Sequence, residues 1–312
     1  MSSDVARRDA PLLIHVGYHK TATTWLQRIL FQPDFGYTPI MSHEEVFAHL
    51  VKPHALVFDP EPVKALIDAR RGRGAAGAAD VISCEILSGN PFFGGRESDE
   101  YARRLKAVAP DARILLSIRE QHRALASLYM QYISRAGTLT PKAFFADEPV
   151  MGYFAFAPEH FEYHRLVGFY RDLFGAENVH VSTQEALVRD SLQLARELGG
   201  FAGATGPKDL SEMSKDPVGV SQPESSAFLL RRINHFQSGP AGLGPVLDLG
   251  PVSNLAYRAT GALARGPLKP LLKEVKPVTA FVAKRFAGRY EESNRALKAM
   301  VGERTDLTGY PM

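Results

Sequence analysis

One segment near the start of the chain, PLLIHVGYHKTATTWLQRILF (residues 11–31), carries most of the information about its architecture. Residues 11–17 form a short apolar run that ends at a glycine, and such a run predicts a buried strand. Four apolar residues then recur at helical spacing: Trp25, Leu26, Ile29 and Leu30. The segment therefore predicts a strand, a tight loop and a helix in succession.

The loop of this segment has the residues of an anion-binding site. It reads Gly17-Tyr18-His19-Lys20-Thr21-Ala22-Thr23-Thr24-Trp25. At a helix start several backbone N–H groups point to one spot, and the helix dipole adds about half a positive charge there. Lys20 contributes a full charge, and three threonines contribute hydroxyl donors. We expect this loop to bind a phosphate or a sulfate. The nucleotide-kinase pattern G-x-x-x-x-G-K-[ST] does not fit, because Ile14 and His19 occupy its two glycine positions.

The following residues alternate apolar runs with helical patterns. Further strands are predicted around Val81–Ile82, at 113–118 and at 178–182, and helices at 159–174 and 185–198. This alternation predicts an α/β fold, a P-loop-like parallel central sheet flanked by helices. In such sheets, ligands bind outside the carboxyl ends of the strands.

Residues 203–285 differ in composition from the rest, because they are rich in Gly, Pro and Ser. We expect a loop-rich insertion that could act as an acceptor lid, with 224–236 as its best helix. The prediction is one domain over residues 11–312, preceded by a flexible N-terminus at 1–10.

Composition excludes several classes of protein. The 312 residues carry a net charge of +3, which is too balanced for a nucleic-acid coat. Cys84 is the only cysteine, so no intramolecular disulfide can form and a reducing compartment is favoured. No signal peptide or membrane span is evident, which predicts a cytoplasmic protein. The histidines show no metal-ligand spacing, and no metal is expected.

The loop resembles the 5′-phosphosulfate loop of sulfotransferases that use 3′-phosphoadenosine 5′-phosphosulfate (PAPS). That loop reads approximately aromatic-x-Lys-Ser/Thr-Gly-Thr-Thr, and residues 18–24 match it except at Ala22, where glycine is usual. If this position requires positive φ, alanine costs about 1 kcal/mol relative to glycine. The resemblance implies that PAPS is the sulfuryl donor and that the whole loop, Lys20, Thr21, Ala22, Thr23, Thr24 and Trp25, binds it.

A second part of the sequence resembles the same superfamily. An arginine at the end of a strand and a serine eight residues later bind the nucleotide 3′-phosphate in its members, and Arg119 and Ser127 have this spacing. A planar guanidinium suits a phosphate because it can donate two parallel hydrogen bonds. Residues 163–198 also look like bacterial members of the superfamily, whereas 203–285 hardly do.

Sulfuryl transfer needs charge stabilisation and a base that removes the acceptor proton. Lys20 can neutralise the bridging oxygen as its bond to sulfur breaks. Glu85 directly follows the second predicted strand and is the preferred base, as in carbohydrate-type and many bacterial sulfotransferases. His19 is a rival base or a sulfate contact within the loop, His15 is expected to be a core residue, and His122 could cap the helix after Arg119.

The resemblance thus implies a sulfotransferase whose acceptor is a small molecule or a carbohydrate, with no metal required. A kinase with a degenerate P-loop and an inactive nucleotide-binding protein are the alternatives. The acceptor class and the oligomeric state stay open. Residues 258–289 are strongly basic, with apolar residues between the charges. They suggest a solvated basic face, or else a lid or a membrane contact.

Overall fold

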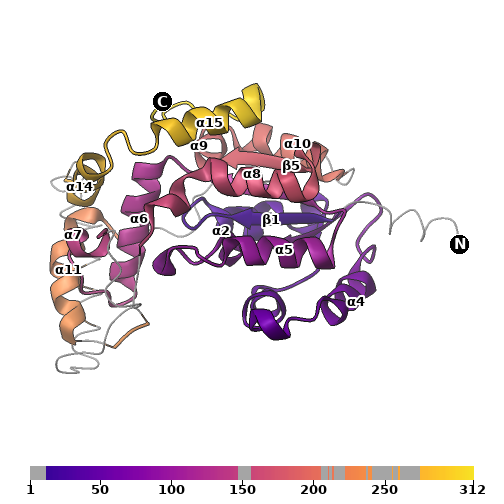
Figure 1. Ribbon diagram of the computed structural model, residues 1–312, viewed down its shortest axis with the longest axis horizontal. Coiled ribbons are helices and arrows are strands. Elements are labelled where there is room, and N and C mark those ends of the chain that lie inside the picture. The colour runs from indigo at the N-terminus through magenta and orange to yellow at the C-terminus, as the bar shows by residue number, and fades with distance from the viewer. Residues whose placement is uncertain are drawn as a thin grey trace, which may run out of the picture. The chain divides into compact units, whose positions relative to one another are not determined.

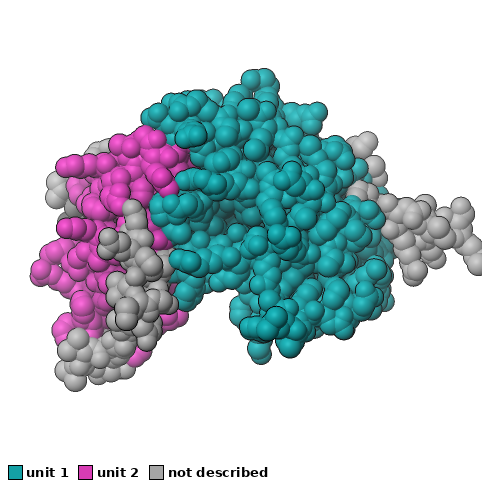
Figure 2. Space-filling model, viewed as in Figure 1, with its two compact units in different colours: residues 1–120, 157–218, 291–312 teal, residues 121–156, 219–290 magenta. Residues whose placement is uncertain are grey.

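The structure is a computed structural model that describes residues 12–146, 156–204, 210, 213, 222–236, 238–240, 255, 259–260 and 275–312. It divides into two compact units (Figure 2). The first unit comprises Met1–Glu120, Ala157–Val218 and Glu291–Met312, and the second comprises Gln121–Phe156 and Gly219–Tyr290.

The first unit is built on a parallel sheet of five strands (Figure 1). The strands are β1 (Leu13–Gly17), β2 (Tyr37–Pro39), β3 (Ala79–Ser83), β4 (Arg113–Ile118) and β5 (Val179–Thr183). Their order is β2-β3-β1-β4-β5, and each neighbouring pair is parallel. The predicted α/β architecture with a central parallel sheet is confirmed.

Helices cover both faces of this sheet, as the nearly continuous burial of its inner strands β1, β3 and β4 requires. One face places Leu13, Val81 and Leu115 in a core cluster with side chains of the α10 helix. On the other side α8 contacts β4 and β5 and packs against α5. The helices of this unit are α2 (Thr23–Trp25), α3 (His43–Val46), α4 (Pro60–Arg70), α5 (Ser98–Val108), α8 (Tyr163–Phe174), α9 (Gln184–Arg189), α10 (Ser191–Ala202) and α15 (Glu291–Val301).

Short helical turns link these elements. The π-helical turns are η1 (Leu26–Leu30) and η3 (Phe47–Val51). The 3-10 turns of the first unit are η2 (Pro33–Phe35), η4 (Ala55–Val57), η5 (Glu85–Ser88), η6 (Pro91–Phe93), η7 (Pro158–Phe161), η8 (Ala176–Asn178) and η11 (Gly302–Arg304).

The second unit is helical and is held together by aromatic side chains. It contains α6 (Gln121–Ser134), α7 (Pro141–Phe144), η9 (Glu224–Ser226), α11 (Ala227–Ile233), η10 (Asn234–Phe236) and α14 (Pro277–Arg285). Phe145 lies at the centre of its packing, with rings of Phe144, Phe156 and Phe286 within 4.8–5.6 Å of its own. The helix predicted at 224–236 is confirmed as η9, α11 and η10.

Four details differ from the sequence prediction. The helix predicted at 159–174 is the 3-10 turn η7 followed, after Glu162, by α8. The edge strand β2 was not predicted, because it is only three residues long and ends in a proline. The helix predicted at 185–198 is two helices, since Asp190 has an extended backbone and caps α10. The helix α10 also continues past the two glycines and ends at Gly203, whose φ is 74°.

Much of the predicted insertion at 203–285 and much of the basic stretch 258–289 lie outside the described residues, so the lid stays a prediction. On α14, Val278 and Val282 are buried while Lys284 and Arg285 are exposed, which fits a solvated basic face over a packed helix. Among the described residues, no helix combines the length and apolar character needed to cross a bilayer.

Candidate functional site

The anion loop lies at the point where the chain changes direction across the sheet. From β1 the chain continues to β2 and β3 on one side, and β4 then lies on the other side of β1. Ligand sites in open α/β sheets form outside the carboxyl ends of two strands related in this way. The loop after β1 and Arg119 after β4 both occupy this edge.

The backbone of the loop is left-handed at two positions, Lys20 with φ 68° and Ala22 with φ 62°. Loops with such turns direct backbone N–H groups into a shared concavity that binds anions. The loop is fixed to the sheet because Tyr18 donates its N–H to the Ser117 carbonyl at 2.9 Å. A side chain at Gly17 has no room, since a Cβ there would lie 2.3 Å from the Thr23 methyl group.

The threonines of the loop have different environments. Thr21 is buried, and its hydroxyl donates to the Tyr18 carbonyl at 2.6 Å. Thr23 is also buried, whereas Thr24 is half-buried. Trp25 is only 5% exposed and packs in the core cluster, so its ring anchors the end of the loop in the core. Lys20 and His19 are half-buried.

Arg119 reaches the anion loop from β4. Its guanidinium donates to the Lys20 carbonyl at 3.3 Å. Its own carbonyl accepts from the Tyr163 hydroxyl at 2.8 Å, and the Tyr163 ring packs edge-on against Tyr18, with 4.7 Å between centroids. The Arg119 guanidinium thus lies against the backbone of the residue that carries the loop's other cation, Lys20.

The other predicted 3′-phosphate ligand, Ser127, lies half-buried on α6 in the second unit. Its cooperation with Arg119 therefore stays a prediction. His122 lies on the same helix, where its Nε2 pairs with the Phe286 carbonyl at 3.4 Å.

Glu85 begins the turn η5, directly after β3. Because β1 and β3 are parallel neighbours and β1 contacts η5, Glu85 lies at the same sheet edge as the anion loop. This position agrees with the sequence prediction. Its side chain is half-buried, and the Gln27 amide donates to its Oε2 at 3.4 Å. The carboxylate is thus oriented by a side chain from η1.

A cavity of about 170 Å³ adjoins this carboxylate. Four apolar or weakly polar side chains and three polar ones line it: Phe31, Pro39, Met41 and Val81, and Gln27, His43 and Ser83. Gln27 both lines the cavity and donates to Glu85, so the cavity lies next to the carboxylate. An apolar cavity of about 150 Å³ is large enough for benzene.

His15 is a core residue, as the sequence predicts. Its two ring nitrogens pair with the hydroxyls of Ser83 on β3 and Ser117 on β4, each at 2.7 Å. Burial lowers the pKa of His15 to about 3. A neutral imidazole that bridges two strands is unsuited to serve as the acceptor base. The Ser83 hydroxyl also accepts from Gln27 at 3.2 Å, so the bridge continues toward Glu85.

No family model matches the chain, and no curated protein matches it. Its structure does match solved structures. A sulfotransferase from Alicyclobacillus acidocaldarius aligns over 96% of this chain and 97% of its own, with a TM-score of 0.51 and 18% identity. The chain has a sulfotransferase fold. This confirms the fold that the sequence resemblance implied.

A second solved structure that aligns with the chain is that of the mouse sulfotransferase SULT7A1, complexed with PAP. It aligns over 92% of each chain, with a TM-score of 0.36 and 13% identity.

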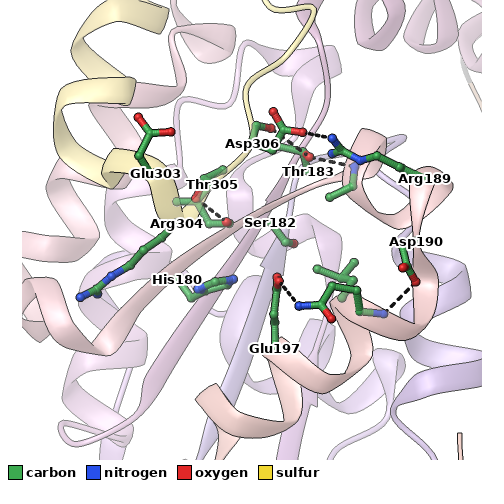
Figure 3. A pocket seen from close by; sticks show the side chains of 14 residues that line it. His180, Ser182, Thr183, Arg189, Asp190, Glu197, Glu303, Arg304, Thr305 and Asp306 are labelled. Atoms are coloured by element: carbon green, nitrogen blue, oxygen red, sulfur yellow. Dashed lines mark hydrogen bonds and ion pairs between the residues drawn. The ribbon is translucent and has the colours of Figure 1, made fainter.

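A larger cavity, of about 240 Å³, lies between β5, α10 and η11, away from the predicted site residues (Figure 3). Its polar side chains pair with one another: Arg189 with Asp306, and Gln193 with Glu197 at 2.8 Å. The Thr305 hydroxyl donates to the Val181 carbonyl at 2.8 Å and so covers the edge strand. Residues of the sheet and of the C-terminal segment both line this cavity, and none of the predicted site residues does.

Sequence reasoning missed His160, which supports the anion loop. Its ring packs 4.9 Å from that of Tyr18, and burial lowers its pKa to about 4. A Cβ at Gly95 would lie 2.1 Å from its Nδ1, so the loop after η6 closes over this ring. No motif surrounds this residue, so the sequence carried no signal for it.

Proposed function

We propose that the chain transfers a sulfuryl group from PAPS to a hydroxyl or amine of a small acceptor. The observation that carries this proposal is the convergence of Lys20, Arg119 and Glu85 at one edge of the sheet. An anionic donor and a proton-bearing acceptor need these two kinds of group side by side.

In this proposal the acceptor oxygen attacks sulfur in line with the bond to the bridging oxygen. The new O–S bond forms as the old one breaks, and adenosine 3′,5′-bisphosphate leaves with the bond's electron pair. Lys20 and the loop N–H groups stabilise the charge that develops on the leaving phosphate. Arg119 and Ser127 bind the 3′-phosphate, which fixes the nucleotide and therefore the sulfur.

Glu85 takes the acceptor proton in this scheme. It is half-buried, and the amide of Gln27, which lines the cavity, donates to one of its carboxylate oxygens. His15 is bridged on both nitrogens, which supports Glu85 over this histidine. His19 remains the rival base.

The cavity narrows the acceptor class. Phe31, Met41 and Val81 offer an apolar wall, and its volume of about 170 Å³ suits a body of benzene size. A phenol or a small apolar alcohol fits this lining better than a sugar, whose many hydroxyls would lose their hydrogen bonds to water.

The test is to incubate the chain with PAPS and a panel of phenols, alcohols, amines and sugars. Mass spectrometry should find the mass of one added SO₃ on a phenol or an alcohol, together with one adenosine 3′,5′-bisphosphate per turnover. Phosphate transfer from ATP that requires magnesium would support the kinase alternative instead. Binding of the bisphosphate with no transfer to any acceptor would support the inactive nucleotide-binding alternative.

A further inference from the structure

Three side chains of different chemistry converge beside the cavity next to Glu85. They are His43, Cys84 and Glu85, and one ligand atom from each lies within 4.8 Å of the other two. The Cys84 sulfur is 3.2 Å from Nδ1 of His43. Imidazole, thiolate and carboxylate are the ligands that zinc prefers in proteins.

Both segments that carry these residues are held firmly. His43 begins α3, where the Ser42 hydroxyl accepts from Glu45 N–H and the Glu45 carboxylate accepts from Ser42 N–H. Arg70 fixes Glu45 with two hydrogen bonds, at 2.6 and 2.9 Å. Cys84 continues the ladder of β3, donating its N–H to the His15 carbonyl at 3.2 Å. The close approach of sulfur and nitrogen is therefore a product of the backbone.

The spacing suits a tetrahedral ion. Bond lengths of about 2.3 Å to sulfur and about 2.0–2.2 Å to nitrogen or oxygen place neighbouring ligand atoms about 3.3–3.6 Å apart. The pair of His43 and Cys84 already has nearly this separation. Glu85 must approach by at most about 1.5 Å to reach this spacing. A half-buried side chain on a one-turn 3-10 helix can do so by changing its rotamer.

Access and a fourth coordination position are also present. Cys84 is fully buried, but His43 is exposed, so an ion can enter from the His43 side. His43 also lines the cavity, which leaves room for a water or another small ligand opposite the three side chains. Three protein ligands and one open position are typical of zinc sites that exchange their ligands.

We propose that His43, Cys84 and Glu85 form a binding site for a zinc-class divalent ion, and that the ion inhibits transfer by occupying the Glu85 carboxylate. On binding, the thiol proton of Cys84 passes to the buffer as the zinc–sulfur bond forms, and no oxidant or reductant is needed. The inhibitory part rests on the proposed function, whereas the binding part does not.

The site is tested with the full chain freed of metal by a chelator. Cobalt(II) replaces zinc and has visible absorption, so titration should produce a sulfur-to-cobalt charge-transfer band and the d–d bands of a four-coordinate ion, saturating at one equivalent. Zinc should abolish both. Cys84→Ser should remove the charge-transfer band. His43→Ala should lower zinc affinity by at least about 10–100-fold, the loss that follows when even a supporting residue is removed.

Two matched control substitutions are available at a histidine and a glutamate outside the cluster. His49 and Glu61 are exposed and outside the cluster, so His49→Ala and Glu61→Gln should keep wild-type zinc affinity. His43 is exposed as well, so His43→Ala keeps the test decisive even if Cys84→Ser fails to fold. Absence of the charge-transfer band at saturating cobalt, or unchanged zinc affinity in His43→Ala, would overturn the site.

The inhibitory consequence is measured separately. Zinc should suppress transfer by the wild type with the midpoint found for binding, and His43→Ala should need at least about ten times more zinc. Full transfer activity with the site saturated by zinc overturns the inhibition. If no acceptor is ever sulfated, the proposed function fails, and the cobalt spectrum still decides the metal site.

Discussion

Replacing Ala22 by glycine tests the conformation of the anion loop. Ala22 has φ 62° and ψ 26°, a left-handed conformation that costs an L-residue about 1–2 kcal/mol and glycine almost nothing. Glycine loses about 0.4–1 kcal/mol through the greater freedom of its unfolded chain. It also loses part of one methyl group's packing against the core cluster, where full burial is worth about 0.8 kcal/mol. Ala22→Gly should therefore be neutral or stabilise the fold by up to about 1 kcal/mol.

Ala22→Val provides the opposite change at the same position. A β-branched residue is a severe outlier in this region, and its strain should cost about 1–3 kcal/mol. The two variants should thus differ by about 1–4 kcal/mol. Ala136→Gly is the matched control, because Ala136 also has a left-handed backbone, with φ 69°, but the residue is buried, at 3% exposure. The loss of that buried methyl should cancel the relief of strain.

The assay is denaturant unfolding followed by the fluorescence of Trp25. This residue is the chain's single tryptophan, it is buried, and it ends the loop, so it reports on this unit directly. Ala22→Gly should unfold at the same or a higher midpoint than the wild type, and Ala22→Val at a clearly lower one. Equal midpoints for the glycine and valine variants would refute the left-handed assignment and the anion-binding loop built on it.

Three further predictions concern catalysis and stability. Lys20→Ala should lower kcat by about 10²–10³-fold through loss of charge stabilisation, and an unchanged kcat in transfer assays would exclude the assigned role. Glu85→Gln should lower transfer about 10²–10⁴-fold while affinity for adenosine 3′,5′-bisphosphate stays near wild type; an active Glu85→Gln beside a crippled His19→Asn would reverse the choice of base. His15 has a folded pKa of about 3, below its ordinary value near 6.5, so the unfolded state binds the extra proton between these values and stability falls as the pH drops. Between pH 7 and 4.5 the loss due to His15 should be about 2–3 kcal/mol in denaturant titrations, and a His15→Asn variant with the same pH slope as the wild type would contradict it.

The parallel sheet and the anion loop could be predicted because their signals are local. The apolar run that ends at Gly17, followed by Lys20 and the threonines, defines a strand, a loop and a helix start within fifteen residues or so. Glu85 and Arg119 could be placed near this loop because the carboxyl ends of parallel strands share one edge. The structure confirms that shared edge, with Arg119 donating to the Lys20 carbonyl.

Other features depend on contacts between distant segments, and no local pattern encodes them. His43 meets Cys84 across 41 positions of sequence, so spacing alone could not indicate a shared ligand site. The bridge from His15 to Ser83 and Ser117 depends on the register of three strands. The split of the helix predicted at 185–198 follows from Asp190, whose capping hydrogen bond to Gln193 N–H outweighs the continuous apolar pattern.

The donor assignment is tested most directly by calorimetric binding of two nucleotides to the wild-type chain without magnesium. Adenosine 3′,5′-bisphosphate should bind more tightly than adenosine 5′-monophosphate by about 1.5–3 kcal/mol, the worth of a charge-assisted contact to the extra phosphate. Arg119→Ala should remove most of this difference and leave the affinity for the monophosphate nearly unchanged. Equal affinity of the wild type for both nucleotides would contradict the assignment of PAPS as the donor.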